Sequence, residues 1–147
     1  MARRLYETVD DLMSEKKVAD KLAVKWGVDM KKLPNHQRMD YAMQRRDKVV
    51  GLCEIKCRTF QWGDYPTVIL SASKVKYAAE IYSQFHIKTM FAVCDREGVI
   101  KYTPIHELKY SLEYGGRTST PRDDQDSELV VAISVYDFSK LEGEKNE

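Results

Sequence analysis

The sequence has little of what marks secreted, membrane-spanning or disulfide-stabilised proteins. Its 147 residues include only three cysteines, Cys53, Cys57 and Cys94, and no C-x-x-C pair. Neither a disulfide framework nor a cysteine zinc site is therefore indicated. No apolar run approaches the roughly 18 residues that cross a bilayer, and the first residues lack the apolar segment of a secretory signal. We expect an intracellular, cytoplasmic protein with no membrane partner.

Glycine and proline are also scarce, with 7 and 4 residues, which argues against a fibrous or low-complexity chain. Hydrophobic residues make up 43% and charged residues 32% of the sequence, as in ordinary folded proteins. We expect one compact domain over residues 1–147, because a chain of this length suits a single hydrophobic core.

The net charge of only +1 conceals an uneven distribution along the chain. Residues 1–60 carry 14 lysines and arginines against 9 acids, whereas residues 111–147 carry 4 against 9. A basic first half is compatible with a surface that binds nucleic acid. Charge alone also fits an ordinary solvated surface.

Hydrophobic spacing predicts the secondary structure. Apolar residues at helical intervals indicate one helix from about Val9 to Trp26, ended by Gly27, and a second over about 72–85. Residues 31–36 are expected to form a basic loop, 39–57 a β-hairpin, 67–70 a short strand and 88–102 a second hairpin around the turn 95–98. A short helix is expected over 106–114, a flexible loop over 117–128, a strand over 129–136 and a frayed tail over 142–147. This order describes a mixed sheet flanked by helices.

The first hairpin carries the residues with the clearest chemical meaning. Glu54 and Lys56 stand two apart on the expected strand and therefore share one face, while Cys53, Ile55 and Cys57 face the other way. On this pattern Cys53 and Cys57 are small core residues. A three-residue turn over 46–48 would place Asp40 opposite Glu54. A two-residue turn would place Asp40 opposite Cys53 unless a bulge intervened.

In the first register two carboxylates lie close together. At roughly 4 Å they repel by about 4 kcal/mol at an effective dielectric near 20, enough to favour a bound cation. A few oxygen ligands suit Mg²⁺ or Mn²⁺, and a neighbouring lysine would complete the parts for metal-assisted phosphodiester hydrolysis. The alternative is an exposed salt-bridge cluster on a half-solvated sheet, in which the same residues only pair with one another.

The chain resembles the PD-(D/E)XK nuclease superfamily, which has the restriction-endonuclease-like fold. The resemblance rests on the order of an opening helix with Glu15, then Arg38-Met39-Asp40-Tyr41, then Glu54-Ile55-Lys56, then a helix opened by Ser71-Ala72-Ser73-Lys74. It covers most of residues 9–95, the αβββαβ core of that superfamily, and looks most like small phage nucleases and archaeal Holliday-junction resolvases. Met39 stands where the motif has its proline.

The resemblance implies an Mg²⁺- or Mn²⁺-dependent nuclease that hydrolyses DNA, with a possible preference for junctions or branched DNA. Asp40, Glu54 and the Ile55 carbonyl would ligate the metal, Lys56 would orient the attacking water, and Glu15 would be an auxiliary carboxylate. The implied DNA contacts are Lys74, Arg58 and Lys17. The alternative is a non-catalytic module of the same fold that binds nucleic acid or serves in assembly.

A loop rich in aromatic residues follows the second strand of the hairpin. Phe60, Trp62 and Tyr65 could stack on bases or fill an interface between two copies of the chain. A homodimer is a further expectation, because symmetric DNA targets are commonly met by two-fold dimers.

Overall fold

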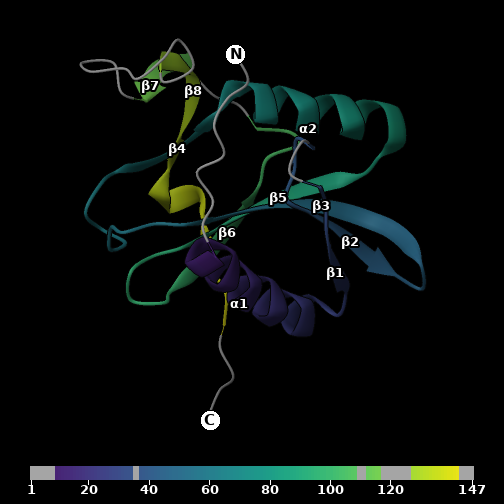
Figure 1. Ribbon diagram of the computed structural model, residues 1–147. Helices are drawn as coiled ribbons and strands as arrows, with labels where there is room; N and C mark the ends of the chain where they lie inside the picture. Colours follow the sequence, from purple (N-terminus) through teal and green to yellow (C-terminus); the bar gives the residue numbers. More distant parts are fainter. Residues whose placement is uncertain (1–8, 35–36, 109–111, 117–126, 143–147) are drawn as a thin grey trace.

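Two helices enclose a six-stranded mixed sheet in the computed structural model, which describes residues 9–34, 37–108, 112–116 and 127–142. Helix α1 (Val9–Trp26) lies on one face of the sheet and α2 (Ala72–Phe85) on the other (Figure 1). The strand order is β1-β2-β3-β5-β6-β9. These strands are β1 (Asp29–Lys32), β2 (Tyr41–Arg45), β3 (Lys48–Cys57), β5 (Lys88–Cys94), β6 (Ile100–Pro104) and β9 (Ser139–Lys140). The expected mixed sheet flanked by helices is confirmed.

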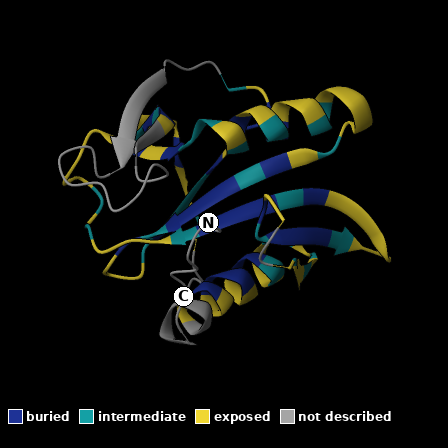
Figure 2. Cartoon of the chain, turned by 45° about the horizontal axis from the view of Figure 1, so that its top comes forward, coloured by how far each residue is buried: buried dark blue, intermediate teal, exposed yellow. Residues whose placement is uncertain are grey.

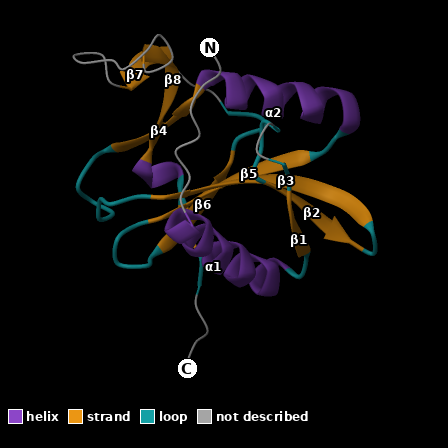
Figure 3. Cartoon of the chain, in the orientation of Figure 1, coloured by secondary structure: helices purple, strands orange, loops and turns teal. Residues whose placement is uncertain are grey.

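Strands β3 and β5 run parallel, whereas the other neighbours in this sheet are antiparallel. A parallel pair needs a crossover connection, which here contains β4 (Thr67–Ser71) and then α2. Strand β4 leaves the central sheet and pairs instead with β8 (Ser127–Ser134), which also pairs with β7 (Leu112–Gly116). Figure 3 shows this small second sheet beside the beginning of α2.

The hydrophobic core is divided by the central sheet. On one face Val18, Ala19 and Leu22 of α1 pack on Tyr41, Cys53, Ile55 and Ala92. On the other face Val75 and Ala78 of α2 pack on Met39, Phe91, Val93 and residues of the second sheet. Figure 2 shows the buried residues concentrated in the central strands and on the side of α1 that faces them. Because both faces of β3 are covered, a side chain on either face can be buried.

The β2–β3 hairpin reaches the expected register by an unexpected route. Its turn has two residues, Arg46 and Asp47, both with positive φ (54° and 64°). Arg45 pairs with Lys48, and a bulge between Met43 and Gln44 then shifts the register, so that Tyr41 pairs with Cys53. One further step places Asp40 beside Glu54. The three-residue turn was wrong, but a two-residue turn with a bulge gives the same pairing.

Three other expectations are corrected. Residues 29–32 form strand β1 rather than leading into a basic loop, because they complete a ladder along β2; residues 35–36 lie outside the described part. The short helix expected over 106–114 is absent where the structure describes this segment: residues 112–114 belong to β7, whose backbone groups are satisfied by β8. Residues 117–126 of the expected loop lie outside the described residues, while Ser127 and Glu128 begin β8.

Two expectations concern the C-terminal tail and a membrane-spanning segment. Residues 143–147 of the expected frayed tail lie outside the described residues. Among the helices that the structure describes, none is both long and apolar enough to span a membrane.

The two-residue turn gives a stability prediction. Asp47→Gly should raise the free energy of unfolding by roughly 0.5–1 kcal/mol, because glycine adopts a positive φ without the strain of an L side chain. Urea denaturation measures the change. Asp29→Gly, at an exposed position of β1, is the matched control and should lower stability, since glycine weakens a strand. A loss of stability in both variants would contradict the turn conformation.

Candidate active site

Asp40 lies just before β2, where the loop from β1 enters the hairpin. Its Oδ2 accepts a hydrogen bond of 2.9 Å from the backbone N–H of Ile55, and its own carbonyl accepts one of 2.8 Å from the N–H of Leu33. The carboxylate is therefore held against β3 by the backbone, one residue from Glu54. The side chain is only partly buried, so it remains accessible from the loop.

Glu54 is unusual because its charged side chain is 0% exposed. Lys74 Nζ donates to its Oε2 at 2.8 Å, and Lys56 Nζ lies 3.2 Å from the same oxygen. The other oxygen, Oε1, is buried and has no hydrogen-bond partner among the described residues. A buried carboxylate oxygen without a partner is costly, so this atom calls for a donor or a cation.

Lys56 and Lys74 reach Glu54 from different elements. Lys56 lies on the same face of β3, two residues on, as the alternation of the strand predicts. Lys74 lies in the first turn of α2 and also donates to the carbonyl of Arg38 at 2.9 Å, in the loop that leads to Met39 and Asp40. Two carboxylates and two ammonium groups are thus collected where β2, β3 and α2 meet.

Glu15, on helix α1, contacts Lys32 and Tyr41 and not the group around Glu54. Its Oε1 accepts a 2.6 Å charged hydrogen bond from Lys32 of β1, and its side chain also hydrogen-bonds with Tyr41. Burial, together with the charge of Glu15, raises the pKa of the Tyr41 phenol. A pocket between α1 and the β1–β2 ladder contains these side chains and is lined by Glu15, Lys16, Ala19, Asp20, Met30, Lys32 and Tyr41.

Glu15 does not complete a three-acid cluster. Among the described residues, no three His, Cys, Asp or Glu side chains are grouped closely enough to hold a metal ion. The structure therefore brings Asp40, Glu54, Lys56 and Lys74 together and leaves Glu15 paired with Lys32. Lys32 was missed in the sequence because its strand, β1, is only four residues long and shows no clear alternation.

The remaining candidate DNA contacts lie around this group. Lys17 is exposed on α1, close in sequence to Glu15. Arg58 directly follows β3, and its guanidinium is near enough to Glu54 for their opposite charges to attract. Lys74, for which a phosphate contact is expected, donates to Glu54 in the structure, a contact that no sequence spacing across 20 residues could have indicated.

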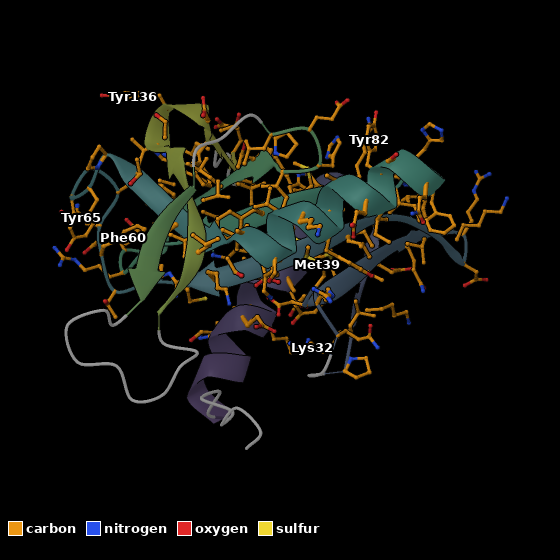
Figure 4. The ribbon with its side chains drawn as sticks, turned by 90° about the horizontal axis from the view of Figure 1, so that it is seen from above. Lys32, Met39, Phe60, Tyr65, Tyr82 and Tyr136 are labelled. Carbon is orange, nitrogen blue, oxygen red and sulfur yellow. The ribbon has the colours of Figure 1, made fainter. Side chains whose placement is uncertain are left out.

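The aromatic loop is packed against the molecule's own core more than the sequence suggested. The Trp62 ring contacts Phe60 and Phe138, and its Nε1 donates to the Val99 carbonyl at 3.0 Å. Tyr65 remains 61% exposed and touches the edge of Phe60 (Figure 4). Of the three aromatic residues proposed for stacking or dimer contact, Tyr65 is thus the one left largely available.

The sequence matches a known family over residues 1–141, almost its whole length, and that family is described as "Phage putative PDDEXK endonuclease". The chain belongs to this family. The resemblance to PD-(D/E)XK nucleases is thereby confirmed. Membership of this family supports a nuclease activity. No curated protein matches the sequence.

A solved structure supports the fold of this PDDEXK family member. The Holliday junction resolvase Hjc of Archaeoglobus fulgidus is similar, with a TM-score of 0.57 and 13% sequence identity, covering 86% of this chain and 85% of the resolvase. At this identity the likeness concerns the fold alone. It confirms the restriction-endonuclease-like arrangement of helices around the mixed sheet.

The paired lysines in this family member give a second prediction. Lys74→Met should lower the free energy of unfolding by about 2 kcal/mol, because it removes a partner from a fully buried carboxylate. Lys56 still compensates part of the charge, so the loss should stay below that of an unpaired buried ion. Urea denaturation at neutral pH with a chelator present measures it.

Lys76→Met, at an exposed position on the same helix, is the matched control and should change stability by less than about 0.5 kcal/mol. Equal stability of the two variants would show that Lys74 does not support Glu54.

Proposed function

We propose that this chain is a divalent-metal-dependent DNA nuclease whose active site is the group Asp40, Glu54, Lys56 and Lys74. The observation that carries the proposal is the buried Oε1 of Glu54, which has no partner among the described residues. Family membership supports phosphodiester hydrolysis. An exposed salt-bridge cluster, the alternative considered from sequence, does not fit a glutamate that is 0% exposed.

The residues present fit an Mg²⁺ or Mn²⁺ ion. Both ions prefer oxygen ligands in small number and retain several waters, and Asp40 and Glu54 offer carboxylate oxygens from adjacent positions of the hairpin. The Ile55 carbonyl would supply a backbone ligand on the same strand. When bound, such an ion lowers the pKa of a coordinated water and offsets charge on the phosphate.

The remaining tasks, which are to orient the ligands, position the attacking water and bind the DNA, would fall to different residues. The backbone N–H of Ile55 fixes the orientation of Asp40, so this carboxylate need not reorganise to act as a ligand. Lys56 is 32% exposed at its side chain and can present its ammonium group to the attacking water and to the charge that develops on the phosphate. Lys74 would hold Glu54 in place. Glu15 would be an auxiliary carboxylate that does not belong to the group of Asp40, Glu54, Lys56 and Lys74. Arg58 and Lys17 would contact the DNA backbone.

The proposal is tested by incubating the chain with supercoiled, linear, single-stranded and branched DNA in Mg²⁺, Mn²⁺ or a chelator. We expect cleavage of at least one substrate with either metal and none with the chelator. Preferential cutting of four-way or branched DNA would establish a junction-specific enzyme. DNA binding without cleavage under every condition would instead establish the non-catalytic module and overturn the proposal.

Metal binding can be tested apart from cleavage. Isothermal titration or electron paramagnetic resonance with Mn²⁺ should detect binding to the unmodified chain and at least tenfold weaker binding to Asp40→Asn, because the substitution removes an anionic ligand. Asp29→Asn, on exposed β1, is the matched control and should bind as the unmodified chain does. Equal binding by both variants would remove Asp40 from the metal site.

A substitution of Lys56 distinguishes a catalytic role of this residue from a structural one. Lys56→Ala should lower the cleavage rate by roughly 10²–10³-fold and change DNA affinity little, because one phosphate contact among several contributes less than stabilisation of the transition state. Cleavage rate, binding at fixed salt and melting temperature should be measured on the same sample.

Lys76→Ala serves as the control for removing a lysine charge and should retain the cleavage rate. Unchanged cleavage in Lys56→Ala would contradict the mechanism, whereas parallel loss of binding and folding would show that Lys56 is structural.

A further inference from the structure

Two cysteines that the sequence separates by 37 positions are neighbours in the structure. Cys57 is the last residue of β3 and Cys94 the last of β5, and they are register partners in the parallel ladder. Adjacent strands lie about 4.8 Å apart, within the 4.4–6.8 Å over which disulfides join Cα atoms. Both cysteines are free, and the Cys94 thiol donates to the backbone carbonyl of Asp95 at 3.6 Å.

Both thiols can be reached from solvent, in contrast to the third. Cys57 is exposed and Cys94 partly buried, which corrects the expectation that Cys57 is a core residue. Cys53 is 0% exposed, and burial raises the pKa of its thiol. The neighbouring Cys57 thiol lowers the pKa of Cys94 to about 7, which favours Cys94 as the thiol that reacts first.

The strand ends are already held at a short separation. The backbone N–H of Arg58 donates to the Cys94 carbonyl at 2.8 Å, which continues the ladder one step past Cys57. Beyond this point the chain leaves both strands, so the two Cβ atoms can approach without breaking the interior of the sheet. The pair lies on the α1 face of the sheet, opposite to Glu54 and Lys56, and the inference is independent of the proposed nuclease activity.

We propose that Cys57 and Cys94 form a dithiol that hydroperoxides oxidise to an intramolecular disulfide. The Cys94 thiolate attacks the peroxide oxygen, the O–O bond breaks, and the Cys94 sulfenic acid forms as one water is released after protonation. The Cys57 sulfur then attacks the Cys94 sulfur, the S–O bond breaks, and a second water leaves with the Cys57 proton. The two thiols lose two electrons in total, and one hydrogen peroxide becomes two waters.

Oxidation of the whole chain with hydrogen peroxide tests the proposal. Three thiols should be titratable in the unfolded, reduced chain, and one should remain after oxidation. Intact mass should fall by two hydrogens, and peptide mapping should join the segments that contain Cys57 and Cys94. Reductant should restore all three thiols.

Single substitutions assign the order of the steps. Cys57→Ser should form no disulfide and should accumulate a Cys94 sulfenic acid that dimedone labels, since the second thiol is missing. Cys94→Ser should give neither the disulfide nor rapid labelling. Cys53→Ala is the matched control and should oxidise as the unmodified chain does.

Retention of three titratable thiols after oxidation, a bond that includes Cys53, or a bond between two chains would each overturn the proposal. So would a Cys94→Ser variant that is labelled as fast as Cys57→Ser at the sulfenic stage, because the first attack would then not belong to Cys94.

Discussion

The burial of the Glu54 carboxylate is the constraint on which the centre of this molecule depends. An ionised side chain that is 0% exposed must be compensated by opposite charge or by hydrogen bonds, or the fold would lose several kcal/mol. Lys56 supplies one ammonium group from the same strand, and Lys74 supplies the other from the first turn of α2. Because Lys74 also binds the Arg38 carbonyl, the same contact ties the loop before Asp40 to the helix.

This compensation explains why the elements that meet at the site are arranged as they are. Helix α2 buries Val75 and Ala78 in the core on one side of the sheet, which brings its first turn over β3. Helix α1 covers the opposite face, so Ile55 and Cys53 are buried there while Glu54 points to α2. The alternation of β3 therefore sorts apolar residues to one helix and charged residues to the other, and the site lies where the second face meets the loop.

Local patterns in the sequence predicted much of this arrangement. Both helices were predictable because their apolar residues recur at helical spacing, and the shared face of Glu54 and Lys56 follows from two-residue alternation alone. The pairing of Asp40 with Glu54 was one of two registers, and it depended on a bulge at Met43 that leaves no clear sequence signal. The sequence alone thus reduced the hairpin to two registers, with Asp40 opposite Glu54 or opposite Cys53, and did not decide between them.

The features that sequence could not predict all depend on contacts between distant segments. Residues 112–114 have a composition compatible with a helix, but β8 offers their backbone a complete ladder. Glu15 has helical spacing suited to an auxiliary carboxylate, yet Lys32, 17 residues away, pairs with it. Cys57 follows the inward-facing pattern of β3, but it is the last residue of the strand and is exposed. In each case the partner is set by tertiary packing.

The two carboxylates of the site have different partners, and this difference affects how the site would bind a metal ion and DNA. Asp40 receives a neutral backbone donor, which orients it and leaves its charge intact. Glu54 receives two ammonium groups, which neutralise its charge and that of its neighbour, so the group as a whole carries no net charge. Under the proposed function, a divalent cation would bring the group to a charge of +2, and the single negative charge of the bound phosphodiester would offset part of it. The resident lysines would thus couple the affinity for metal to the presence of DNA.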